Sequence, residues 1–148
     1  MTKIAPFLPN FVGTRVDGRQ GAPIHAARVD TVKLAGVEDF RGTRAEVHLA
    51  TEDGSAGFRG RVTSLLVNHD RPHHLVGCGP EPMLHAVADL AKTWRVPCHL
   101  SLETPMACGV GICFTCVTPV RTGDGWDYRR VCVDGPVFDA ACLAWDKP

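Results

Sequence analysis

The stretch "HHLVGCGPEPMLHAVADLAKTW", His73–Trp94, decides the fold class. Its first residues form a short apolar run that predicts a strand ending near Gly77, and Gly79 and Pro80 predict a turn. Pro82 favours a helix start there, because proline lacks only an N–H that would be unpaired in a first turn. Glu81 suits the positive end of that helix. The predicted helix carries an apolar face at helical spacing, made of Met83, Leu84, Val87, Leu90 and Ala91.

The segments on either side of this stretch extend the pattern. Ala45, Val47 and Leu49 alternate with Glu46, His48 and Ala50, which predicts a strand that ends at the turn "TEDGSAG". The segment "FRGRVTSLLVNH", residues 58–69, predicts a short helix with Val62, Leu65 and Leu66 on one face. The segment "PCHLSLE", residues 97–103, predicts another strand. Strands that alternate with helices indicate an α/β fold with a parallel sheet.

The remaining segments have less regular patterns. Residues 1–40 are rich in glycine, proline and charge, and they predict a loop or a leader of unclear structure. After residue 103 the pattern changes to loops and short strands, with turns at "RTGDGW" and "VDGP".

Composition narrows the class of protein. The 148 residues contain 16 lysines and arginines and 16 aspartates and glutamates, so nothing predicts attraction to nucleic acid or to an acidic membrane. No apolar run approaches the ~20 residues of a membrane span, and the first residues make a poor signal peptide. We therefore expect a cytoplasmic protein. Seven cysteines without an export signal favour metal or cluster ligation over disulfides.

Four cysteines have the spacing of a cluster site. The pattern is C-x4-C-x2-C followed by x15-C, and its first part is the plant-type 2Fe–2S ligand spacing. Gly109 and Gly111 permit a loop that wraps closely and aims backbone N–H groups at the sulfurs. The candidate ligands are Cys108, Cys113, Cys116 and Cys132.

Other interpretations of the cysteines remain open at this point. Structural zinc usually takes two C-x2-C pairs, whereas here only Cys113 and Cys116 form one. Ordinary buried or redox cysteines are a further alternative. Cys98 and Cys142 lie among apolar residues, and we expect both to be buried.

Two turns are candidate nucleotide sites. In a parallel α/β sheet, ligands bind beyond the carboxyl ends of the strands, so the turn Cys78–Met83 between strand and helix is a natural place for a nucleotide. Its alternative is a tight turn with a buried cysteine. An acidic residue past a strand can bind a ribose hydroxyl, which makes Thr51–Ser55 a second candidate. Its alternative is also a simple turn.

The quoted motifs, taken together, carry a family resemblance. The chain resembles the electron-transfer subunit of NAD-dependent dihydroorotate dehydrogenase, in the ferredoxin–NADP reductase superfamily. The resemblance covers roughly two thirds of the chain, from Arg44 to Trp145. It is carried by "ATEDGSAGFRGRVTSLL", "CGPEPML", "SLETPMACGVGICFTCV" and "YRRVCVDGPVF".

The resemblance implies a partial NAD-binding α/β domain over residues 41–103 and a small loop-rich 2Fe–2S domain over residues 104–148. By that analogy the four candidate cysteines ligate the cluster, while Cys78, Gly79 and Pro80 lie near the nicotinamide and flavin rings. The turn continues on the NAD side through Glu81, Pro82 and Met83. The nucleotide groove is lined by Asp53, Gly54 and Ser55.

The family's function is an electron relay. NADH gives a hydride to FAD, and electrons pass singly through the 2Fe–2S cluster to a partner flavoprotein that converts dihydroorotate to orotate in pyrimidine biosynthesis. We therefore expect a non-catalytic or partial subunit of a hetero-oligomeric oxidoreductase, with no catalytic residue of its own. The alternatives are a stand-alone ferredoxin-like carrier and a subunit of another NAD(P)H-linked oxidoreductase.

The chain departs from the family pattern in its first 40 residues. The flavin-binding barrel with its Arg-x-Tyr-Ser/Thr-like signature and the glycine-rich nucleotide loop are not found, and the single tyrosine is Tyr128. The chain thus looks like the C-terminal part of the family, as a truncated gene, a wrong start codon or a split subunit would produce. FAD and NAD are implied by the family, but this chain alone offers no barrel for the flavin and an incomplete half-site for NAD.

Overall fold

A computed structural model describes residues 11–15, 24–28 and 47–147. The chain divides into two compact units, Met1–His74 and Leu75–Pro148. Both units combine strands with helix, which confirms the α/β class. The sequence places a domain boundary after residue 103 instead, and that functional boundary stays a prediction. Among the described residues, no helix has the length and apolar character needed to cross a membrane.

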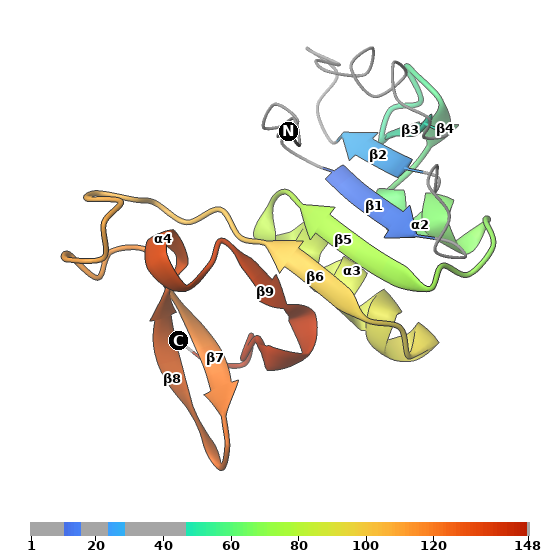
Figure 1. Ribbon diagram of the computed structural model, residues 1–148. Coiled ribbons are helices and arrows are strands. Elements are labelled where there is room, and N and C mark those ends of the chain that lie inside the picture. Colours follow the sequence, from blue (N-terminus) through green and yellow to red (C-terminus); the bar gives the residue numbers. More distant parts are fainter. Residues whose placement is uncertain (1–10, 16–23, 29–46, 148) are drawn as a thin grey trace, which may run out of the picture. The chain divides into compact units, whose positions relative to one another are not determined.

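The first unit contains a small mixed sheet (Figure 1). Its strand order is β4-β3-β2-β1, in which β1 and β2 are antiparallel while β2, β3 and β4 run parallel. The short helix α2 buries Val62, Leu65 and Leu66, as the sequence predicts. The elements are β1 (Phe11–Arg15), β2 (Ile24–Arg28), β3 (Val47–Thr51), β4 (Phe58–Arg59) and α2 (Val62–Val67).

Two sequence predictions are wrong in this unit. Residues 11–15 and 24–28 are strands, not loop; the rest of residues 1–40 lies outside the described residues. These strands are specified by pairing with neighbours, as in the ladder that sets Ile24 opposite Val47, and local composition does not reveal such pairing. The predicted helix over residues 58–69 begins only after Arg61, because residues 58 and 59 pair with β3.

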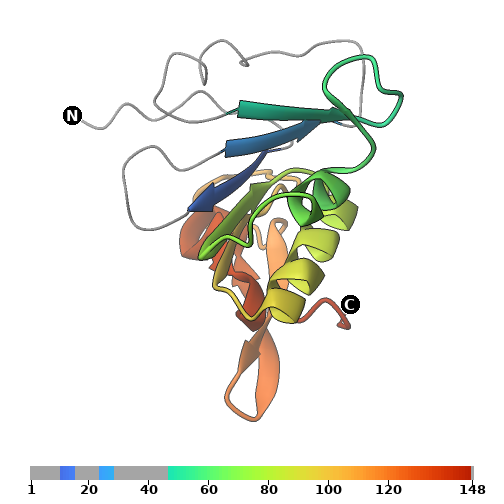
Figure 2. The ribbon, with the colours of Figure 1, turned by 90° about the vertical axis from the view of Figure 1, so that its right-hand side faces the viewer.

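The second unit is built on the predicted strand–turn–helix. Strand β5 (His74–Cys78) leads through a turn into α3 (Glu81–Trp94), and β6 (Cys98–Ser101) returns parallel to β5. Strand β9 (Val137–Asp139) pairs antiparallel with β6. Figure 2 shows α3 lying along one face of β5 and β6. The core between them contains Leu75, Leu84, Val87, Ala91 and Leu100.

The rest of this unit follows β6. Residues 103–116 have no regular secondary structure; they leave β6 as a long loop and lead into β7 (Figure 1). The β7–β8 hairpin reverses at Gly123, as the "RTGDGW" turn predicts. Its elements are β7 (Val117–Thr122), β8 (Gly125–Arg130), α4 (Val131–Asp134) and the short 3-10 helix η1 (Ala140–Cys142).

Candidate metal centre

The four candidate ligands come from two segments of the second unit. Cys108, Cys113 and Cys116 lie on the loop of residues 103–116, and Cys132 lies in α4. Cys116 is buried, Cys108 and Cys132 are half-buried, and Cys113 is exposed. The two segments are joined by a hydrogen bond of 2.7 Å from the Val131 N–H to the Cys116 carbonyl oxygen. This bond brings the segment of Cys132 against that of Cys116.

The cysteine side chains are arranged as two pairs. A side-chain interaction with Cys113 lowers the pKa of the Cys108 thiol, and one with Cys132 lowers the pKa of the Cys116 thiol. Within the described ranges, no group of three or more His, Cys, Asp or Glu side chains is disposed to hold one ion. A 2Fe–2S cluster has two irons and four cysteine ligands, so two pairs of thiols fit such a cluster.

Backbone donors surround the sulfur atoms, as the sequence predicts. Hydrogen bonds from the backbone N–H groups of Cys113 and Val110 lower the pKa of the Cys108 thiol to about 6. The Cys132 N–H does the same for Cys116, lowering its pKa. Because the thiolate is the form that binds metal, these donors prepare both sulfurs for ligation. The hydrogen bond to Cys116 and burial raise the pKa of Cys132.

The two glycines of the loop have positive φ, as expected. Gly109 has φ +67° and Gly111 has φ +81°. A Cβ at Gly111 would lie 2.5 Å from Val133 Cγ2, whereas a Cβ at Gly109 would meet no atom within 4 Å. Gly111 is therefore required both for its backbone conformation and for the close approach of the loop to α4, while Gly109 is required for conformation alone.

The other two cysteines differ from each other. Cys98 is buried as expected, and burial raises the pKa of its thiol to about 12. Cys142 is exposed, so the prediction that it is buried is wrong. Cys142 ends the one-turn helix η1, and the buried positions are taken by the next residues, Leu143 and Ala144.

The turn between β5 and α3 forms as the sequence predicts. Cys78 ends β5, Gly79 has φ +154°, and α3 begins at Glu81 with a proline in its first turn. Cys78 is half-buried, and its thiol donates a hydrogen bond to Glu103 Oε1 at 3.7 Å. Burial raises the pKa of this thiol, so Cys78 is held in the neutral form.

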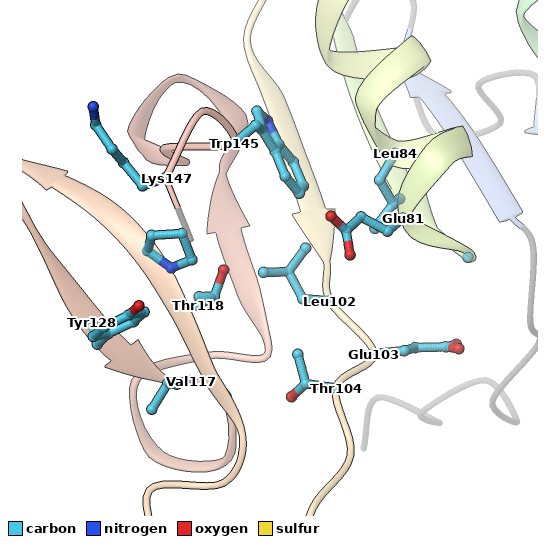
Figure 3. Close-up of a pocket in the computed structure, with 12 residues that line it drawn as sticks. Glu81, Leu84, Leu102, Glu103, Thr104, Val117, Thr118, Tyr128, Trp145 and Lys147 are labelled. Atoms are coloured by element: carbon cyan, nitrogen blue, oxygen red, sulfur yellow. The ribbon is translucent and has the colours of Figure 1, made fainter.

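A pocket of about 330 Å³ lies beside this turn (Figure 3). Gly79 and Glu81, two of the predicted cofactor-binding residues, line it, and Figure 3 shows the Glu81 carboxylate directed toward Leu102. Its volume is that of a small-molecule site. Sequence reasoning missed most of its lining, because these residues come from separate segments: Leu84, Leu102, Glu103, Thr104, Val117, Thr118, Pro119, Tyr128, Trp145 and Lys147.

The second candidate nucleotide segment is a self-contained turn of the first unit. The Asp53 carboxylate accepts a hydrogen bond from the Ser55 N–H at 3.0 Å, which lowers the pKa of Asp53. Gly54 has φ +77°, and its N–H donates to the Thr51 carbonyl oxygen at 3.2 Å. These hydrogen bonds are those of a turn, so the residue types at 51–55 are accounted for by the turn itself. A role in a nucleotide groove stays a prediction.

Three thiols on a glycine-rich loop and a fourth in α4, beside an α/β strand–turn–helix, define an iron–sulfur cluster binding domain. Residues 103–144 match the family model of the iron-sulfur cluster binding domain of dihydroorotate dehydrogenase B, and this segment contains all four candidate ligands. The match confirms the resemblance found in the sequence and supports the predicted 2Fe–2S cluster.

Curated relatives extend the similarity beyond this domain. The chain is 47% identical over 103 residues to the dihydroorotate dehydrogenase B (NAD(+)) electron transfer subunit of Caldanaerobacter subterraneus, covering 69% of this chain and 41% of the relative. The Bacillus caldolyticus subunit is 48% identical over 96 residues, covering 64% and 36%. The chain thus spans less than half the length of the curated relatives it matches.

A solved structure shares the fold. It is the NADH-dependent reduced ferredoxin–NADP oxidoreductase, described for its flavin-based electron bifurcation. The TM-score is 0.63 at 25% sequence identity, over 84% of this chain and 45% of that chain.

Proposed function

We propose that this chain is the cluster-bearing part of an electron-transfer subunit of the dihydroorotate dehydrogenase type. It passes electrons between NAD(H)/flavin and a partner flavoprotein during oxidation of dihydroorotate to orotate. The observation that carries the proposal is the arrangement of four cysteines as two thiol pairs within a segment that matches the cluster domain of that family.

In this proposal Cys108, Cys113, Cys116 and Cys132 hold the cluster. When bound, a 2Fe–2S cluster accepts and gives one electron at a time. The loop's own contribution is electrostatic, because the backbone N–H groups that hydrogen-bond Cys108 and Cys116 stabilise negative charge on sulfur. Close wrapping by the loop at Gly111 fixes these donors in place.

The β5–α3 turn is the proposed nicotinamide and flavin side of the subunit. The pocket beside Gly79 and Glu81 supports a ligand at Cys78–Met83, since it lies where strands of an α/β sheet end. Asp53, Gly54 and Ser55 are the proposed residues of the nucleotide groove. FAD and NAD are proposed as cofactors of the complex.

The proposed partner docks on the cluster loop. Val110, Ile112 and Phe114 are 66%, 78% and 62% exposed, although all three are apolar. Exposed apolar side chains gathered on one loop mark an interaction surface, and here they lie between the cysteines that would hold the cluster. A flavoprotein seated on them would bring its flavin near the cluster, which is the arrangement a hetero-oligomer requires. Placement in the cytoplasm stays a prediction.

The test is reduction of the cluster by dihydroorotate. The loaded chain is mixed anaerobically with a dihydroorotate dehydrogenase catalytic flavoprotein, and bleaching of the cluster absorbance is followed after dihydroorotate is added. We expect bleaching only with both partners present. We expect Ile112→Asp to weaken it, and Val67→Asp, at an exposed apolar position of α2, to leave it unchanged. A cluster reduced by dithionite but never by dihydroorotate would favour a stand-alone carrier or another complex.

A further inference from the structure

Arg130, at the end of β8, joins the cluster loop to the segment that carries Cys132. Its Nη1 donates a hydrogen bond to the Gly111 carbonyl oxygen at 3.0 Å. Its Cζ lies 5.2 Å from the centroid of the Phe114 ring, a cation–π distance. Its Nε lies 3.6 Å from Asp134 Oδ2. One guanidinium therefore contacts a backbone carbonyl, an aromatic ring and a carboxylate.

These contacts fall in both intervals between the ligands on the loop. Gly111 lies between Cys108 and Cys113, and Phe114 lies between Cys113 and Cys116. On the other side, Asp134 Oδ2 also accepts the Arg130 backbone N–H at 2.8 Å, which fixes the start of α4 and with it Cys132. Arg130 thus contacts the loop that carries three candidate ligands on one side and the helix that carries the fourth on the other.

The charge of Arg130 has a second consequence. A guanidinium stays protonated at all ordinary pH, and this one is only 33% exposed, so solvent screens it less than a surface charge. The reduced cluster is more negative than the oxidised one by one electron, and nearby charge and hydrogen bonds set the potential of such clusters. The Asp134 carboxylate, 3.6 Å from Nε, offsets part of this charge, and the part that remains at the Gly111 carbonyl favours the reduced state.

We propose that Arg130 is a positioning residue that clamps the cluster loop to α4 and makes the cluster easier to reduce. This inference rests on the cluster site of the proposed function.

Arg129 supplies a matched control for the charge. It is the next residue of β8, and alternation along a strand points its side chain to the other face of the hairpin. Its Nη1 lies 3.8 Å from Asp127 Oδ2, within the same strand. Arg129→Gln therefore removes the same charge one residue away without touching the contacts that Arg130 makes with the loop.

The experiment compares the wild type with Arg130→Lys, Arg130→Gln and Arg129→Gln after anaerobic loading. Iron and sulfide analysis comes first, to establish the cluster in the wild type. A mediated redox titration then measures the midpoint potential, and a chelator measures the rate of iron loss. We expect Arg130→Gln to shift the potential to more negative values and to lose iron several-fold faster. Arg130→Lys keeps the positive charge but lacks the planar set of N–H donors of the guanidinium. We therefore expect a midpoint potential close to that of the wild type and a faster loss of iron. We expect Arg129→Gln to match the wild type in both.

The outcomes separate this inference from its premise. A wild-type chain without iron and sulfide would overturn the proposed function and this inference together. A loaded wild type whose Arg130 variants keep its potential and its iron-loss rate would overturn this inference alone. If Arg130→Gln fails to load, amide hydrogen exchange of the metal-free chains decides. Faster exchange at residues 111–114 than in Arg129→Gln supports the clamp, and equal exchange contradicts it.

Discussion

Gly111→Ala tests whether the close approach of the loop to α4 matters for the cluster. An alanine there needs φ +81°, a conformation that costs an L-residue about 1–2 kcal/mol. Its Cβ would also lie 2.5 Å from Val133 Cγ2, and relief of such overpacking costs about 1–3 kcal/mol more. The β-branched Val133 cannot move aside by rotating a long chain, so we expect the total to be about 2–5 kcal/mol.

Gly109→Ala is the matched control. It requires φ +67°, but its Cβ meets no atom within 4 Å, so we expect only the conformational cost of about 1–2 kcal/mol. Thermal unfolding and chelator-driven iron loss of the loaded chains measure both variants. We expect Gly111→Ala to be clearly the worse, and the double variant with Val133→Ala to return it to the level of Gly109→Ala. If the two glycine variants behaved equally, or if Val133→Ala gave no rescue, the close contact between residue 111 and Val133 would not be the cause of the loss.

Three further predictions use standard measurements. Cys113→Ser should lose the cluster, whereas Cys142→Ala, at an exposed cysteine, should keep it; iron analysis measures both. Loss of iron in Cys142→Ala would mean that Cys142 is a ligand in place of Cys132. In the metal-free chain, the reaction of Cys108 with iodoacetamide should be half-maximal near pH 6, since its lowered pKa of about 6 is the pH at which half of the thiol is thiolate. A midpoint near pH 9 in a mass-spectrometric pH profile would contradict the donor geometry. Leu100→Ala, at a fully buried position of β6, should lower the free energy of unfolding of the second unit by about 2–5 kcal/mol in a denaturant titration. A loss below about 1 kcal/mol would mean that Leu100 is not packed in the core of this unit.

The elements that the sequence predicts correctly are those specified by neighbouring residues along the chain. The strand–turn–helix from β5 to α3 carries a proline and an acidic residue in the first helical turn and apolar residues at helical spacing, so its bounds were clear from the sequence. The spacing of the four cysteines likewise indicates their chemistry without the fold. Ligand chemistry depends on residue type and on a short loop, both of which the sequence displays directly.

The elements that could not be predicted depend on contacts between distant segments. Strands β1 and β2 form because they pair with each other and with β3. The glycines and prolines around them in the sequence predict a loop, so the strands could not be recognised from local composition. Cys142 lies on a single turn, which is too short to show a periodicity that separates buried from exposed sides. The role of Arg130 follows from contacts with Gly111 and Phe114, which lie 19 and 16 residues away in the sequence.

Anaerobic purification of the chain alone, with an absorption spectrum and iron, sulfide, zinc and flavin analysis, tests most directly whether the four cysteines hold a 2Fe–2S cluster. We expect a red-brown protein with about two irons and two sulfides per chain, because two pairs of cysteine thiolates hold a dinuclear cluster. A colourless preparation with zinc in place of iron and sulfide would contradict the electron-transfer function itself.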